Sequence, residues 1–129
     1  MKEKRKLIGV ILSDLEEDYQ SNVVSGIMAE ARRLNYNVAV FSSFIKSKTS
    51  MPELELGESD IFRLINTDKF DALIVLPYTL DMRIAYDILL RKVNECHCPV
   101  ISIDSPFGDV CYTVTSDEAS SIKELTDHI

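Results

Sequence analysis

The chain has 129 residues, of which 46% are hydrophobic and 27% are charged, and its formal net charge at pH 7 is −7. This length suits one domain, and the composition is typical of a globular protein rather than a disordered segment. No apolar run approaches the roughly 20 residues that cross a bilayer, and the acidic balance disfavours binding to nucleic acid. We therefore expect a cytoplasmic protein with no membrane contact and no direct nucleic-acid contact.

Short apolar runs alternate with segments of helical spacing, and we expect the apolar runs to be strands buried on both faces of a parallel sheet. These runs lie at 7–12, 38–41, 71–76, 99–103 and 111–114. Helical spacing predicts helices between them, at about 23–34, 59–66, 81–95 and 117–129. The segment 42–55, which contains Pro52, is expected to be a polar connection. This order predicts an α/β fold over 1–129, with a doubly wound, mostly parallel five-stranded sheet and helices on both faces.

Binding sites in such a sheet form at the carboxyl ends of the strands. Here those ends are followed by 13–19, 42–44, 77–79 and 104–107. The first of these loops is acidic, and its Asp and Glu side chains can cap the following helix, contact a ligand, or do both. Aromatic side chains in three of the loops, Tyr19, Phe44 and Tyr78, can stack on a flat ligand or cover the sheet edge.

Two phosphate-binding signatures are absent from the chain. A GxGxxG turn does not follow the first strand, because after Gly9 no glycine occurs until Gly26, and no GxxxxGK[ST] segment exists. The four carboxylates between residues 14 and 18 would also repel a phosphate at the start of the first helix. No nucleotide, flavin or other cofactor is therefore expected.

Two other α/β functions serve as alternatives. A phosphoacceptor receiver domain needs an Asp after the third strand and a Lys after the last, where this chain has Leu76-Pro77 and Thr115-Ser116. A small flavodoxin-like enzyme, complete in 129 residues, could instead use an acid in the first loop. No catalytic residue is assigned, because the sequence contains no recognisable catalytic constellation.

The three cysteines are expected to be reduced thiols that bind no metal. Cys96 and Cys98 flank His97 before the fourth strand, and Cys111 lies further along. The Cys-His-Cys spacing crowds ligands that usually need at least two spacer residues to surround one ion. Free cysteine is among the most often buried residue types, which favours a structural role.

Several segments, in order and at suitable spacing, resemble type I periplasmic-binding-protein-like domains, the effector-sensing domains of LacI-type regulators. The opening carries KLIGVILSD from Lys6 and GIMAEARRLNYNVAVF from Gly26. FDALIVLP from Phe70 and CPVISID from Cys98 resemble the third and fourth strands of that family. VTSD from Val114, which opens the last expected helix, resembles the segment that follows the fifth strand.

The resemblance implies an N-terminal lobe of a two-lobed sensor that regulates an output domain missing from this chain. A small-molecule effector, which could be sugar-like, would bridge two lobes at a hinge. The positions that face the cleft in the family match these residues here: Ser13, Asp14, Tyr19, Phe41, Ser42, Pro77, Tyr78 and Asp104.

The resemblance also bears on the output and on assembly. Residues 44–47, 57–61 and 64–66 are similar to sensors that precede a GGDEF diguanylate cyclase domain in bacterial signalling proteins. No GGDEF motif is present here. LacI-type regulators carry a helix-turn-helix before this domain, whereas the first expected strand here begins at Leu7. Because N-terminal lobes commonly pair in the family, the resemblance implies a homodimer through the first helix and the neighbouring edge, where Met28 lies at the margin of the apolar stripe. The alternative is that the whole stripe packs on the sheet.

Overall fold

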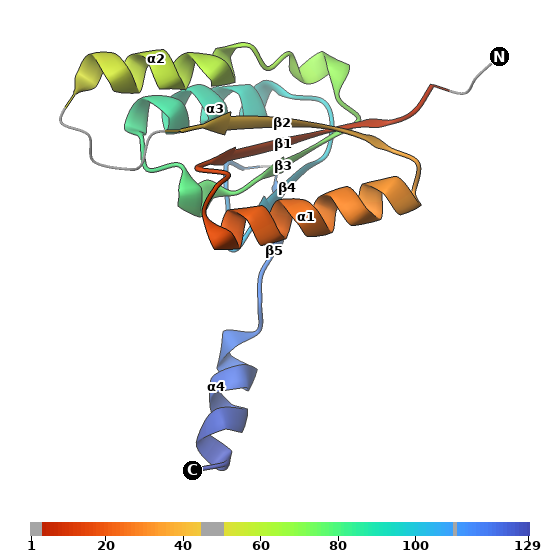
Figure 1. The fold of residues 1–129 in the computed structure, drawn as a ribbon, viewed down its shortest axis with the longest axis vertical. Helices are drawn as coiled ribbons and strands as arrows, with labels where there is room; N and C mark the ends of the chain where they lie inside the picture. Colours follow the sequence, from red (N-terminus) through yellow and green to blue (C-terminus); the bar gives the residue numbers. More distant parts are fainter. Residues whose placement is uncertain (1–3, 45–50, 110) are drawn as a thin grey trace.

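The computed structural model describes residues 4–44, 51–109 and 111–129 of the chain. In these residues, strands and helices alternate (Figure 1). The strands are β1 (Leu7–Ser13), β2 (Asn37–Ser43), β3 (Ala72–Val75), β4 (Val100–Ile103) and β5 (Cys111–Val114). The helices are α1 (Asp18–Arg33), α2 (Pro52–Arg63), α3 (Arg83–Glu95) and α4 (Glu118–Asp127), with short 3₁₀ turns at Thr67–Lys69 and Pro77–Thr79.

The strands form one sheet in the order β2-β1-β3-β4-β5, and every neighbouring pair is parallel. This arrangement confirms the predicted doubly wound α/β fold. The chain runs from β1 outward to β2 and then returns to the other side of β1 to form β3. The direction of winding therefore reverses between β1 and β3, which is where such sheets open a crevice at their carboxyl edge.

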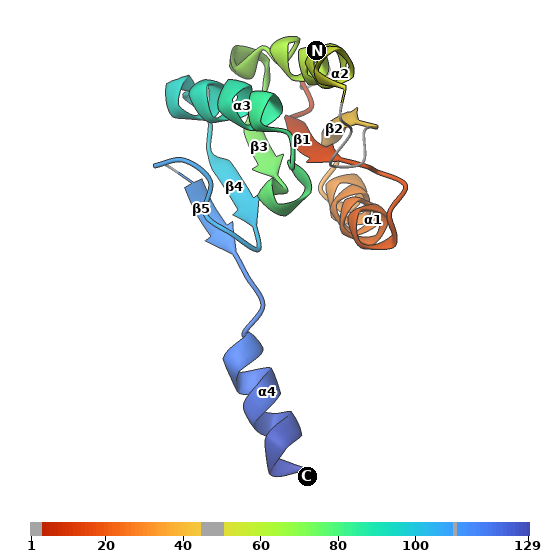
Figure 2. The ribbon, with the colours of Figure 1, turned by 90° about the vertical axis from the view of Figure 1, so that its left-hand side faces the viewer.

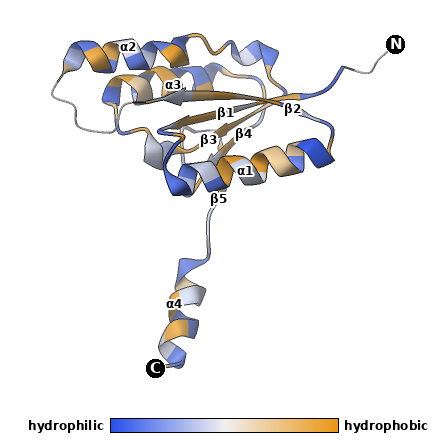
Figure 3. Ribbon diagram, viewed as in Figure 1, coloured by the Kyte–Doolittle hydropathy of each residue, from blue (hydrophilic) through white to orange (hydrophobic). Residues whose placement is uncertain are grey.

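Helices cover the two faces of the sheet unequally. Figures 1 and 2 show α2 and α3 side by side on one face and α1 on the other. The side chains of β1 alternate between the faces: Ile11 joins the cluster under α2 and α3, whereas Val10 and Leu12 join the cluster under α1. Hydrophobic colour accordingly runs along the central strands in Figure 3, while α1 and α2 carry hydrophobic and hydrophilic stretches together.

The bounds of α2 differ most from the sequence expectation. The predicted helix at 59–66 begins instead at Pro52. The prediction that residues 52–55 belong to a polar connection is therefore wrong. Proline suits the first helical turn, where its missing N–H needs no partner, and Glu53 and Glu55 complement the positive end of the helix dipole. Residues 45–47, which carry part of the narrower resemblance, lie outside the described residues.

The last helix stands apart from the sheet. In Figures 1 and 2, α4 extends away from the body of the lobe, and every one of its side chains is exposed. Asp117 accepts a hydrogen bond from the backbone N–H of Ser120 at 3.0 Å and so caps the helix. Ile122 and Leu125 are 63% and 65% exposed, so the apolar stripe of α4 has no core to pack on in this lobe.

Met28 lies on α1, partly buried against the cluster that contains Val24 and Leu76. This position agrees with a place at the margin of the apolar stripe, and pairing through α1 stays a prediction. Over the part of the chain that the structure describes, no helix combines the length and hydropathy needed to cross a bilayer.

Candidate functional site

A pocket of about 420 Å³ lies at the carboxyl edge of the sheet. Its lining residues come from the start of α1, from the turns after β3 and β4, and from the segment after β5 together with the first residue of α4. They are Tyr19, Tyr78, Asp104, Thr115, Ser116 and Glu118. We call this the strand-end pocket. It unites three residues predicted to contact a ligand with three that the sequence analysis did not select.

Tyr19 and Asp104 connect α1 to the end of β4. The phenol of Tyr19 donates a hydrogen bond to the Oδ2 atom of Asp104, although the two residues are far apart in the sequence. This hydrogen bond, partial burial and the negative charge of Asp104 raise the pKa of Tyr19 to about 12. Tyr19 therefore stays protonated at neutral pH and presents a hydroxyl group at the wall of the pocket, while Tyr78 is 74% exposed.

Two strands end at an aspartate in the left-handed backbone region. Asp14 follows β1 with φ 54°, and Asp104 follows β4 with φ 70°. Aspartate is one of the few residue types other than glycine that adopts this conformation readily. The backbone N–H of Asp14 donates to the carbonyl of Ser43 at 2.8 Å, and that of Asp104 donates to the carbonyl of Val114 at 2.8 Å. Each aspartate thus makes the last ladder hydrogen bond of its strand and then turns the chain outward into the loop.

Ser13 belongs to a buried polar network beneath the loops rather than to the wall of the pocket. Its Oγ atom lies 2.6 Å from that of Ser43, and both residues are nearly inaccessible to solvent. The backbone N–H of Ser13 donates to the Oγ1 atom of Thr79 at 2.9 Å, and Thr79 in turn donates to the carbonyl of Leu76 at 2.8 Å. The network joins the ends of β1, β2 and β3, and so it fixes the loops that carry the pocket residues.

The remaining predicted residues lie in or near the scaffold. Phe41 packs edge-on against Phe70, with ring centroids 5.8 Å apart, on the side of the sheet that α2 and α3 cover. The Ser42 hydroxyl donates to the carbonyl of Ser43 at 3.1 Å, and Pro77 is buried. None of these three lines the strand-end pocket, and ligand contact by any of the eight predicted residues stays a prediction.

Thr115, Ser116 and Glu118 line the pocket but were missed by the sequence analysis. They follow β5, whose carboxyl end lies at the same edge of the sheet as those of β1, β3 and β4. The strand-end rule, extended to the fifth strand, would have selected Thr115 and Ser116. Glu118 opens α4, and its place in the pocket depends on the path of the connection after β5.

The acidic loop before α1 supplies only part of the expected capping. Glu17 occupies the position before the helix, and its side chain makes no capping hydrogen bond to the helix backbone. Asp18 lies in the first turn, where its charge complements the helix dipole.

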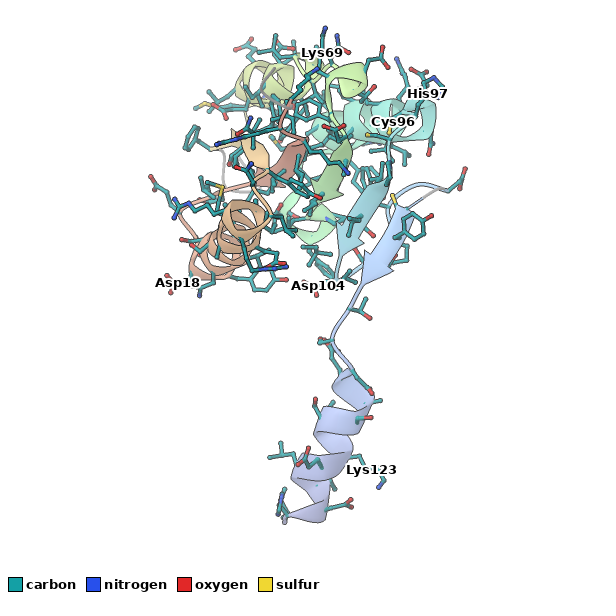
Figure 4. All side chains as sticks on the ribbon, turned by 90° about the vertical axis from the view of Figure 1, so that its right-hand side faces the viewer. Asp18, Lys69, Cys96, His97, Asp104 and Lys123 are labelled. Atoms are coloured by element: carbon teal, nitrogen blue, oxygen red, sulfur yellow. The ribbon has the colours of Figure 1, made fainter. Side chains whose placement is uncertain are left out.

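A larger pocket of about 660 Å³ lies at the opposite, amino edge of the sheet and includes Lys4, Arg5, Lys69 and Asp71. Figure 4 shows Lys69 and Asp104 on opposite sides of the lobe. The carboxylate of Asp71 is already used by the backbone N–H of Leu7, at 2.7 Å. We favour the smaller strand-end pocket, because the reversal of strand order opens the sheet at its carboxyl edge.

The cysteines lie away from the strand-end pocket. Cys96, Cys98 and Cys111 are free thiols with intermediate exposure, and His97 is exposed between the first two. Among the described residues, no group of three or more His, Cys, Asp or Glu side chains is placed to hold a metal ion. The expectation that these cysteines bind no metal stays a prediction.

The fold is that of one lobe of a LacI-type, periplasmic-binding-protein-like domain. It superimposes with a TM-score of 0.64 on a LacI family transcriptional regulator, CcpA from Weissella paramesenteroides, in structures with bound sucrose and with bound glucose. Sequence identity is 16% and 15%, and the match covers 95% of this chain and 41% of that one. The Lac repressor dimer, bound to operator and the anti-inducer ONPF, matches with the same TM-score at 17% identity over 98% of this chain and 42% of the repressor.

The chain thus spans about two fifths of the length of these structural neighbours. No protein-family model matches the sequence, and no curated protein matches it significantly. At this level of identity, the likeness establishes the fold, and function has to be argued from the site.

Proposed function

We propose that this chain is one lobe of a two-lobed sensor and that a small-molecule effector binds at its strand-end pocket. The observation that carries the proposal is the meeting of Tyr19, Tyr78 and Asp104 in one pocket, although they follow three different strands. That pocket lies at the edge of the sheet where open α/β folds bind ligands. The likeness to regulators crystallised with sucrose and glucose supports a hydroxyl-rich effector.

The chemistry of the pocket favours a neutral polyhydroxyl ligand over an anionic one. Asp104 and Glu118 supply carboxylate acceptors, and Thr115 and Ser116 supply hydroxyl groups that can donate and accept. The ring of Tyr78 is largely exposed, so its face is open to the apolar face of a sugar. A phosphate or carboxylate group would meet the negative charges of Asp104 and Glu118, which makes a sugar phosphate a poor ligand.

Regulation would follow from differential affinity for two arrangements of the lobes. A ligand that contacts both lobes stabilises the closed arrangement by the difference between its affinities for the closed and open forms. The exposed apolar stripe of α4, with Ile122 and Leu125, would then pack in the second lobe rather than on this sheet. Half of the contacts would come from that lobe, so the isolated chain should bind its effector only weakly.

The lobe itself is proposed to be non-catalytic and to control a separate output domain. The transcriptional regulators among the structural neighbours support a transcriptional output. Diguanylate cyclase activity of a downstream domain is the alternative that the sequence resemblance suggested, and the comparisons lend it no support. Turnover of a nucleotide, phosphodonor or ester by this chain would favour the flavodoxin-like enzyme instead.

Saturation-transfer difference NMR, which detects weak binding, tests the proposal. Glucose and sucrose are the neutral probes, and glucose 6-phosphate is the anionic one. We expect a saturation-transfer signal from at least one neutral sugar and a weaker signal from the sugar phosphate. Binding of none of the three would contradict a sugar-like effector, and stronger binding of the phosphate at the strand-end pocket would contradict the proposed role of the carboxylates.

Matched variants locate the binding. Asp104→Asn keeps the size of the side chain and removes its charge, and it should weaken the signal severalfold. Lys69→Gln makes a similar change at the opposite edge and should leave the signal unchanged. Equal effects of the two substitutions would show that the sugar does not bind at the strand-end pocket.

A further inference from the structure

Two thiols touch in the turn between α3 and β4. The sulfur atoms of Cys96 and Cys98 lie 3.5 Å apart, and the thiol of Cys96 donates to the backbone carbonyl of Cys98 at 3.1 Å. Both side chains also pack against the core cluster under α2 and α3. The contact is therefore held by the backbone and the core, unlike a chance approach of two mobile surface side chains.

The neighbourhood of the pair leaves it accessible. His97 between the two cysteines is exposed, and so is Pro99, which precedes β4. Figure 4 shows Cys96 and His97 at the end of α3, on the side of the lobe away from Asp104. A small oxidant can thus reach the turn without entering the strand-end pocket.

We propose that Cys96 and Cys98 form a reversible modification site, at which a peroxide converts the two thiols into an intramolecular disulfide. The proposal does not depend on the sensor function. Disulfide formation needs a sulfur–sulfur distance of about 2.05 Å. The sulfurs must therefore approach by about 1.5 Å from their present 3.5 Å, within a turn whose middle residue, His97, is exposed.

The reaction takes place in two balanced steps. The thiolate of one cysteine attacks a peroxide oxygen, the O–O bond breaks, and a sulfenic acid forms as hydroxide leaves and takes up a proton to become water. The thiol of the other cysteine then loses its proton and attacks the sulfenic sulfur, which expels a second water as the S–S bond forms. For hydrogen peroxide, two thiols give one disulfide and two waters, so the peroxide is the only oxidant required.

We assign the first attack to Cys96 and the second to Cys98. Burial, and then the hydrogen bond with Cys96, raise the pKa of Cys98 to about 11, so this thiol keeps its proton and suits the second step. Burial also raises the pKa of Cys111, and its thiol donates to the carbonyl of Phe107. Because the sulfur–sulfur contact joins Cys96 and Cys98, Cys111 is expected to remain a thiol when these two react.

Alkylation after peroxide treatment tests the proposal. The full chain is exposed to hydrogen peroxide, freed of the oxidant and treated with iodoacetamide under denaturing, non-reducing conditions. We expect one labelled cysteine in place of three, a mass about 2 Da lower before labelling, and full reversal by dithiothreitol. No Lys or Arg lies between Lys92 and Lys123, so one tryptic peptide holds all three cysteines and its fragments locate the label.

Variants and a second probe identify the partners. Cys111→Ser should still form the disulfide, whereas Cys96→Ser and Cys98→Ser should not. Phenylarsine oxide, which bridges adjacent thiols, should block two of the three alkylation sites of the unaltered chain, so the result does not rest on the folding of a variant. Three alkylable thiols after peroxide, or a disulfide that contains Cys111, would overturn the proposal.

Discussion

The hydrogen bond between Tyr19 and Asp104 joins two lining residues of the strand-end pocket. It joins the first turn of α1 to the loop after β4, and it holds a phenol whose pKa is about 12. A raised pKa in the folded state means that the fold stabilises the protonated phenol. The contribution to stability is fully present below the unfolded pKa of about 10, and it is lost as the pH rises to about 12.

This linkage predicts how stability falls at alkaline pH. Over pH 10 to 12, the free energy of unfolding of the Tyr19→Phe variant should fall less steeply than that of the unaltered chain, because Phe has no proton to lose. Urea denaturation at a series of pH values measures the difference. Tyr78→Phe, which removes the other phenol of the pocket, is the matched control. Equal slopes for Tyr19→Phe and the unaltered chain would contradict the contact.

The buried pair of Ser13 and Ser43 gives a second prediction at this scale. Each hydroxyl is the partner of the other at 2.6 Å, so removing one leaves a buried polar group without that partner. We expect Ser43→Ala or Ser13→Ala to cost about 1–3 kcal/mol, and the double variant to cost less than the sum. Urea denaturation of the four proteins gives the coupling energy, and strictly additive costs would contradict a shared network.

Among the elements, β1 shows how closely the strands and core pack. A Cβ atom on Gly9 would lie 2.7 Å from a Leu73 side-chain carbon and 3.1 Å from the ring of Phe70, whereas one on Gly26 in α1 would meet nothing within 4 Å. Gly9→Ala should therefore destabilise the fold by about 1–3 kcal/mol through overpacking. Gly26→Ala, the matched control, should stabilise it by about 0.5–1 kcal/mol through helix propensity. Thermal or urea denaturation measures both changes in stability. A Gly9→Ala variant as stable as the unaltered chain would contradict the close packing around Gly9.

Helix α4 supports a prediction of the opposite kind. Leu125 is 65% exposed, whereas Leu89 of α3 is fully buried in the core. Leu89→Ala should cost about 2–5 kcal/mol. Leu125→Ala should change the stability of this chain by less than about 0.5 kcal/mol, as surface substitutions usually do. A large cost for Leu125→Ala would show that α4 packs on the sheet in solution.

The elements were predictable where burial and sequence pattern agree. The short apolar runs of β1, β3 and β4 contain buried residues, and all three strands were predicted to within a few residues of their observed bounds. The start of α2 was missed because the helical spacing of apolar residues in the sequence begins only near Ile61. In the first turns of the helix, Leu54 and Leu56 are exposed and do not belong to the buried face. Pro52 followed by acids was the available signal, and it was interpreted as part of a loop.

The site was predictable only in part, for a similar reason. The strand-end rule placed Tyr19, Tyr78 and Asp104 at one edge, and the structure brings them together in one pocket. The rule does not distinguish a residue that faces the pocket from one that packs beneath the loops. It therefore also selected Ser13, which is buried, and Phe41, which packs against Phe70. The direction in which each side chain points depends on the pleat and on packing between distant elements.

The whole molecule has charges of opposite sign at its two edges. Lys4, Arg5 and Lys69 lie at the amino edge, and the carboxylates of Asp104 and Glu118 lie at the carboxyl edge. An anionic ligand would therefore be drawn to the amino edge, and a neutral one has no electrostatic reason to avoid the strand-end pocket. The location of ligand binding therefore tests the proposed sensor function more directly than the affinity does.

The most direct test is a ¹H–¹⁵N NMR titration of the labelled chain with the neutral sugar that gives the strongest saturation-transfer signal. The account predicts that amide shifts move at the strand-end pocket, near Tyr19, Tyr78, Asp104 and Thr115, and stay fixed near Asn35 and Lys69 at the amino edge. Shifts confined to the amino edge, or no shifts at sugar concentrations that saturate the transfer signal, would contradict it.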